Sequence, residues 1–205
     1  EQLKALNATD IGELSTTQLT ALSTAQLGAL TATNVSALDA TQTAALTTTQ
    51  IKGLTADQLK GLTTTDIGEL ADTQIAALTA DQIKNLSATN VSALSQTQVA
   101  ALNGTQIKGL TTTQLQGLTT TDIAELSATQ VGALATSQIS AISLTNIKSL
   151  STTQVSALSA AQIGALSATN FSALDATQIG ALNETQVKGL TTSQLAALNA
   201  TDIGE

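Results

Sequence analysis

The 205-residue chain is long enough for one or two ordinary domains, but it contains no His, Cys, Met, Pro, Trp or Tyr, and Phe171 is its one aromatic residue. Without His and Cys it lacks the commonest catalytic bases, nucleophiles and transition-metal ligands, so the sequence predicts a protein that is not an enzyme and holds no cofactor. A net charge of −8, with Lys as the only cation, argues against nucleic-acid binding and against docking on an anionic membrane, and no apolar run approaches the roughly 18 residues that span a bilayer.

An eight-residue repeat begins at Leu3 and continues without an insertion to the last residue. We label its positions a to h, starting at Leu3. Position a is Ile, Leu or Val except at Thr43 and Phe171, and position d is Leu except at Ile142. Position e is Ser, Thr, Asn or Asp in all but two copies, and position h is Gln in most. We therefore predict a single continuous array over residues 1–205, of about 25 octads, which is a piece of a longer chain.

Each octad carries the signals of a helix start, as residues 46–54 (LTTTQIKGL) illustrate. Thr47 can cap the helix by accepting a hydrogen bond from an early amide, and Gln50 can reach back to the amide of the cap, which completes a capping box. Leu46 and Ile51 have the spacing of a hydrophobic staple, and Ile51 and Leu54 share one helix face. Because these signals recur in most octads, they predict a short helix in each one.

One continuous helix does not fit the repeat, because eight residues leave an offset of about 80° per octad and the leucines would circle the helix. A plain strand does not fit either, because positions a and d would point to opposite faces. The sequence therefore predicts an all-α fold, a solenoid or superhelix of very short helices of about two turns, one per octad. A β-solenoid with a corner inside each octad suits the Ser and Thr content and is the alternative fold.

A second period, of seven octads, lies over the first. The motifs TDIGEL and TDIAEL recur at this step, with their aspartates at Asp10, Asp66 and Asp122. The register slips once, where Asn170 follows Asn146 after only three octads. If two octads made one coil these motifs would alternate sides, whereas a superhelical turn of seven octads would align them and favour a spiral or a self-associating fibre.

Three other positions of the repeat suggest roles. Gln at position h can serve only the capping box, or it can also form a hydrogen-bonded ladder along the array, because a side-chain amide both donates and accepts. Gly at position c either lets neighbouring helices approach closely or only loosens the helix end. All seven Lys occupy position b, which predicts a solvent-exposed charged stripe.

Carboxylate pairs in the TDIGEL motifs are weak candidates for a metal site. They are Asp10 with Glu13, Asp66 with Glu69, Asp122 with Glu125, and Asp202 with Glu205. Calcium needs six to eight oxygen ligands, and no calcium-binding loop motif supplies the remainder. We therefore interpret each Asp as an early-turn residue favoured by the helix dipole, with Glu facing solvent, and we predict no metal site.

The octads LTTTQIKGL, LSTAQLGAL and LSATQVGAL resemble the low-complexity arrays of very large bacterial proteins that belong to the cell-surface, adhesion or type I-secreted classes. The resemblance covers the whole chain and implies an extended extracellular or cell-surface element. The calcium-binding nonapeptides of many type I-secreted proteins are missing from this chain.

These observations favour a structural extracellular protein that forms a rod, stalk or filament, either as an adhesin spacer or as a self-assembling fibre. The expected partners are further copies of the chain, in a homo-oligomer or filament, together with a cell-surface or glycan partner, and neither nucleic acid nor membrane insertion is expected. The alternative function is a binding module that presents a Ser/Thr-rich face to glycan or ice.

Overall fold

A computed structural model describes residues 5–198 of the chain. These residues form short α-helices and no strand, so the predicted all-α solenoid is confirmed and the β-solenoid alternative is wrong. The chain divides into two compact units, residues 1–109 and 110–205.

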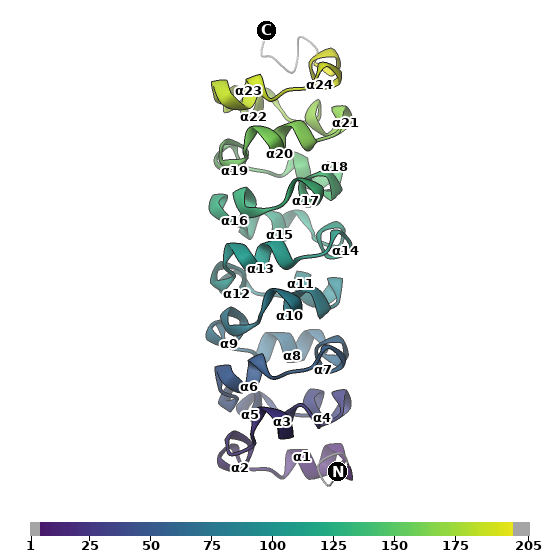
Figure 1. The fold of residues 1–205 in the computed structure, drawn as a ribbon, viewed down its shortest axis with the longest axis vertical. Coiled ribbons are helices and arrows are strands. Elements are labelled where there is room, and N and C mark those ends of the chain that lie inside the picture. Colours follow the sequence, from purple (N-terminus) through teal and green to yellow (C-terminus); the bar gives the residue numbers. More distant parts are fainter. Residues whose placement is uncertain (1–4, 199–205) are drawn as a thin grey trace. The chain divides into compact units, whose positions relative to one another are not determined.

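The helices of both units follow one another at eight-residue intervals (Figure 1). The first unit contains α1 (Ala8–Gly12), α2 (Thr16–Thr20), α3 (Thr24–Leu27), α4 (Ala32–Ser36), α5 (Ala40–Ala45), α6 (Thr48–Lys52), α7 (Ala56–Gly61), α8 (Thr64–Glu69), α9 (Asp72–Ala77), α10 (Ala80–Asn85), α11 (Ala88–Ser92), α12 (Gln96–Ala101) and α13 (Gly104–Gly109). The second contains α14 (Thr112–Gln116), α15 (Thr120–Glu125), α16 (Ala128–Ala133), α17 (Thr136–Ala141), α18 (Leu144–Lys148), α19 (Thr152–Ala157), α20 (Ala160–Ala165), α21 (Ala168–Phe171), α22 (Ala176–Gly180), α23 (Glu184–Lys188) and α24 (Thr192–Ala197).

The capping box predicted for residues 47–54 is present in α6. Thr47 Oγ1 accepts from the amide of Gln50 at 3.2 Å, and Gln50 Oε1 accepts from the amide of Thr47 at 3.0 Å. Leu46, Ile51 and Leu54 are all buried, as the staple and the shared helix face require. Thr47, Gln50, Ile51 and Leu54 therefore hold the structural positions expected of them.

Each described helix ends one to three residues before position d. Leu62 illustrates this, because its backbone is extended, with φ −64° and ψ 142°, and the next cap, Thr63, is extended as well. The helices consequently have four to six residues, slightly shorter than the two turns expected from the sequence. The two extended residues form the corner between one helix and the next.

The corners wind each unit into a coil. A helix packs mainly on the third helix after it, as α4 does on α7 and as α16 does on α19. Contacts between successive turns join residues 25 to 31 apart, a range centred on 28, so one turn holds about three and a half octads. The seven-octad period therefore equals two turns rather than one. Figure 1 shows the result in the first unit, where α2 and α9, seven octads apart, lie on the same side.

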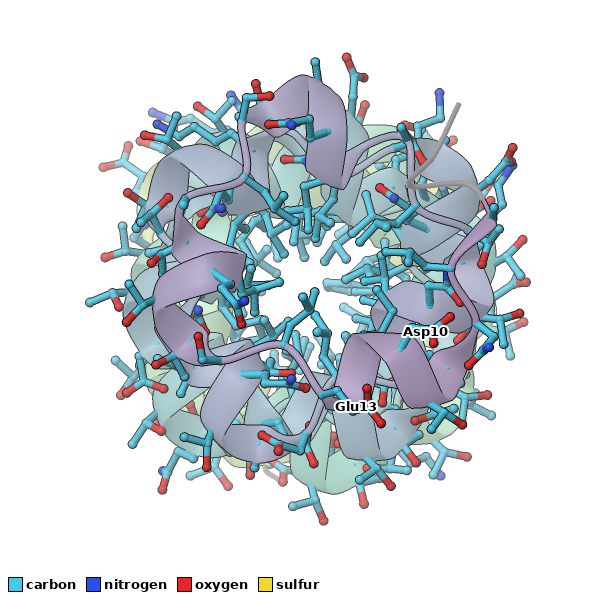
Figure 2. All side chains as sticks on the ribbon, turned by 90° about the horizontal axis from the view of Figure 1, so that it is seen from below. Asp10 and Glu13 are labelled. Carbon is cyan, nitrogen blue, oxygen red and sulfur yellow. The ribbon has the colours of Figure 1, made fainter. Side chains whose placement is uncertain are left out.

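Positions a and d supply the core of each coil, and side chains point both into the ring of helices and away from it (Figure 2). From Ile11 to Phe171 every residue at position a is buried, the polar exception Thr43 included. Fully burying one such aliphatic side chain contributes about 1.5–3 kcal/mol, so helices too short to persist alone are held by the coil. The lysines at position b in the described residues are exposed, as the sequence predicts.

Glycine at position c permits close contact between turns. A Cβ atom built on Gly61 would lie 2.6 Å from the Cβ of Ala32, and one on Gly53 would lie 2.8 Å from the Cβ of Thr24. The backbone of Gly53 is right-handed helical, with φ −85°, so a positive φ does not explain its use. Of the two roles considered for these glycines, the close approach between helices is the one the contacts support.

Replacing Gly61 with alanine is expected to destabilise the protein by about 1–3 kcal/mol, because the added methyl group overlaps Ala32 of the neighbouring turn. Gly68 is the matched control: a Cβ there would meet nothing within 4 Å, so alanine should stabilise helix α8 by up to about 1 kcal/mol. Urea denaturation followed by circular dichroism measures both variants. Shifts of the same sign would contradict the close-contact role of Gly61.

Candidate functional site: the glutamine ladder between turns

The side-chain amide at position h joins each turn of the coil to the previous one. While Gln50 Oε1 completes the capping box, Gln50 Nε2 donates to the carbonyl oxygens of Leu19 and Leu22, each at 2.9 Å. These are the carbonyls of positions a and d in the octad three before it. Gln50 is only 3% exposed, so all of these bonds form away from bulk water. Both roles considered for Gln from the sequence are present together.

We call the glutamines that repeat this contact the glutamine ladder. Each donates through Nε2 to the position-d carbonyl of the preceding turn, and most donate also to the carbonyl of position a or b just before it. The ladder consists of Gln42, Gln50, Gln58, Gln74, Gln82, Gln98 and Gln106 in the first unit, and of Gln138, Gln154, Gln162, Gln178, Gln186 and Gln194 in the second. It supplies a donor to the position-d carbonyls at the helix ends. The position-a carbonyls also accept from the position-d amide of their own octad, as that of Leu19 does from Leu22.

Asparagine at position h keeps only the contact between turns. Asn34 Nδ2 donates to the carbonyl of Leu6 at 2.8 Å, and Asn90 Nδ2 donates to that of Leu62 at 2.8 Å. The shorter side chain does not return to the cap amide, so the octads of Asn34 and Asn90 have no capping box.

Aspartate at position h completes the capping box but cannot make the ladder contact between turns. Asp66 Oδ2 accepts from the amide of Thr63 at 2.7 Å, and Asp122 Oδ2 accepts from that of Thr119 at 2.7 Å, so both complete capping boxes. A carboxylate has no N–H group and cannot donate to the preceding turn. Instead, Asp66 Oδ2 accepts from Ser36 Oγ of that turn at 2.5 Å. Sequence reasoning missed Ser36; the available signal was its constant separation from an Asp at position h.

The weak metal candidates do not converge. Asp10 accepts from the amide of Asn7 at 2.8 Å, in a capping box on α1, and Glu13 is exposed (Figure 2). Within residues 5–198 no group of three or more acidic side chains is placed to hold a metal ion. One Oε2 atom, that of Glu69, is buried without a hydrogen-bond partner.

The other two candidate pairs add no further ligand. Asp122 and Glu125 lie on α15, where Asp122 completes a capping box. The pair Asp202 and Glu205 lies outside the described residues.

A small cavity lies beside Thr43, the residue that replaces the usual aliphatic side chain at position a. Its volume is about 20 Å³, and its polar lining comes from Thr43 and Asp66. The remaining lining is aliphatic, with Ile51 and Leu54 among it. This space is too small for an organic substrate.

Asp175 caps α22, and a pH prediction follows from it. The backbone amide of Gln178, which donates to Asp175 Oδ1 at 2.8 Å, and Thr177 hold the pKa of this exposed carboxylate below its ordinary value. The stabilisation is fully present above the ordinary aspartate pKa of about 4 and is lost as the pH falls through the lower folded-state pKa. In acid titrations of thermal stability, Asp175→Asn should flatten the pH dependence slightly. An unchanged pH profile in this variant would contradict a contribution from Asp175.

None of the described helices is long and apolar enough to cross a membrane. In comparisons with known proteins, no curated protein matches the chain. Its residues 1–32 match the family model of the ALTTAQ repeat, which covers four octads of the array. This match and the regular helices identify the chain as a repeat protein, similar over residues 1–32 to the ALTTAQ repeat.

Proposed function

We propose that the protein is a structural, non-enzymatic repeat protein that forms a rod, stalk or filament at the cell surface or outside the cell. The glutamine ladder carries this proposal, because one hydrogen-bonded contact recurs from turn to turn within each unit. A coil held by nearest-neighbour contacts of this kind can be lengthened by whole octads without a new core. An extracellular place is supported by the acidic, cysteine-free composition and by the resemblance to bacterial surface arrays.

Self-association is part of the proposal. It is supported by two exposed surfaces, one with side-chain amide donors and one with aliphatic side chains. Gln18 and Gln26 lie in the first unit, are exposed, and offer Nε2 donors like those of the ladder. Val187 and Leu195, at position a in the second unit, are 49% and 52% exposed, although position a is buried through most of the array.

Analytical ultracentrifugation and electron microscopy of the 205-residue chain over a range of concentrations test this proposal. We expect rod-shaped particles whose length grows with concentration. The double variant Val187→Asp with Leu195→Asp should reduce the growth, whereas Leu144→Asp, at another exposed leucine, should not. Compact monodisperse particles at every concentration would refute the filament. Labelling of intact source cells with an antibody tests the surface location.

The glycan- or ice-binding alternative stays a prediction. Most hydroxyls at position e act as helix caps, as those of Thr47 and Thr55 do. A glycan array and an ice-recrystallisation assay on the same material separate the alternative from the structural role, and specific binding in either would displace it.

A further inference from the structure

The contact between Ser36 and Asp66 joins two turns in the opposite direction to the ladder. At every ladder position the later turn donates and the earlier turn accepts. At Asp66 the earlier turn donates, through Ser36 Oγ, and the later turn accepts, through Oδ2 at 2.5 Å. Asp66 is 8% exposed, so its carboxylate depends on protein donors rather than on water. The amide of Thr63 supplies one donor and Ser36 supplies the other.

The sequence repeats this pair at a constant separation. Each Asp at position h that has a residue 30 positions before it has Ser there: Ser36 with Asp66, Ser92 with Asp122, and Ser172 with Asp202. An Asn lies two positions before each of these serines. The third pair keeps its spacing even though it follows the slip in the seven-octad period. Asp202 lies outside the described residues.

One copy of the motif has lost both members together. Asn146 is followed by Lys148 in place of Ser, and the position above Lys148 in the next turn is Gln178 in place of Asp. Gln178 behaves as a ladder residue and donates to the carbonyls of Leu150 at 2.5 Å and Lys148 at 3.3 Å. Where the hydroxyl donor is absent, the acceptor is therefore replaced by a side chain that can donate.

Aspartate at position h requires a serine in the preceding turn, but a serine at position b does not require an aspartate. Ser140 and Ser156 occupy the same position b but donate to backbone carbonyls. Ser140 Oγ donates to that of Ser137, and Ser156 Oγ donates to those of Thr152 and Ala181. Aspartate at position h, in contrast, occurs only above a serine wherever the chain contains the lower position. The requirement thus comes from the carboxylate, which is costly to bury without charge-assisted hydrogen bonds.

We infer that the Ser36–Asp66 pair determines which octads face each other across the turns, and thereby fixes the register of the coil. The aliphatic columns and the ladder do not by themselves select which octads face each other, because the octads are nearly identical. Slipping the array by one octad would place Asp66 over Gly28 or Ala44, the neighbouring residues at position b, and neither offers a side-chain donor. The pair is satisfied in one register, and this inference does not depend on the proposed function.

A double-mutant cycle tests the contact, with the variants Ser36→Ala, Asp66→Asn and both together. Each single variant should lower the thermal midpoint by about 2–4 °C, the shift typical of one lost hydrogen bond in a chain of this size. The double variant should lose less than the sum of the two. Ser156→Ala combined with Asp66→Asn is the matched control and should be additive. Additive shifts for Ser36 and Asp66 would overturn the inference.

A second variant distinguishes an effect of the pair on the register of the coil from an effect on thermal stability. Ser36→Lys with Asp66→Gln copies the natural Lys148–Gln178 pair, so we expect its thermal midpoint to match that of the parent chain. After unfolding and refolding, hydrogen exchange read by mass spectrometry should show one isotopic envelope in peptides spanning residues 30–70 of the parent and two in the variant. A single envelope in both chains would overturn the role in register.

Discussion

Replacing Gln50 with glutamate is expected to destabilise the protein by about 3–5 kcal/mol, although the side chain keeps its shape. Gln50 is buried, and its Nε2 donates to the carbonyls of Leu19 and Leu22. A carboxylate would keep the capping-box acceptor but would place a buried charge against two carbonyl oxygens, with no donor between them. Urea denaturation at neutral pH measures the loss. Because burial raises the pKa of the introduced carboxyl, protonation at lower pH should recover part of it.

Gln18→Glu is the matched control for this prediction. Gln18 Oε1 accepts from the amide of Ser15 at 2.9 Å, as in the other capping boxes, but Gln18 is exposed and its Nε2 has no acceptor within residues 5–198. The free energy of unfolding should change by no more than about 0.5 kcal/mol. A loss at Gln50 as small as the one at Gln18 would show that the contact between turns contributes little.

Replacing Phe171 with alanine is expected to cost about 3–5 kcal/mol. Phe171 is fully buried and is the largest such side chain in the described core. Alanine would remove its packing and leave a cavity, since the neighbouring turns are held at fixed separation by the ladder. Thermal and urea denaturation measure the effect.

Phe171→Leu distinguishes this cavity from a special need for an aromatic ring. Leu is among the usual residues at position a, so leucine should cost less than about 1.5 kcal/mol. If leucine proved as harmful as alanine, the site would depend on the ring itself and not on filled volume.

The helix of each octad could be predicted because its determinants lie close together in the chain. The cap at Thr47, its partner Gln50 and the staple from Leu46 to Ile51 fall within six consecutive residues, and each depends on local geometry alone. The capping half of the ladder was predictable for the same reason. Ala71 shows how robust this local code is, because Gln74 Oε1 still accepts from its amide at 2.8 Å although alanine has no acceptor.

The number of octads per turn could not be predicted, because it depends on the angle at every corner. That angle is set by the extended residues at positions d and e, such as Leu62 and Thr63, and by packing between helices distant in the chain. The same reason hid the role of Ser36, whose partner lies a full turn away. Local patterns at Asp66 and Glu69 suggested a metal pair, whereas the capping of Asp66 explains its carboxylate without a metal.

The length of a turn has a genetic consequence. Within a unit, seven octads make two full turns. A duplicated block of seven octads therefore places each of its side chains on the same side of the coil as the original, and the arrangement of exposed side chains is kept. The three-octad step from Asn146 to Asn170 falls about one seventh of a turn short of alignment. In the second unit, every motif after that step therefore lies on a different side of the coil. One incomplete duplication is enough to move a set of exposed side chains around the coil without altering the core.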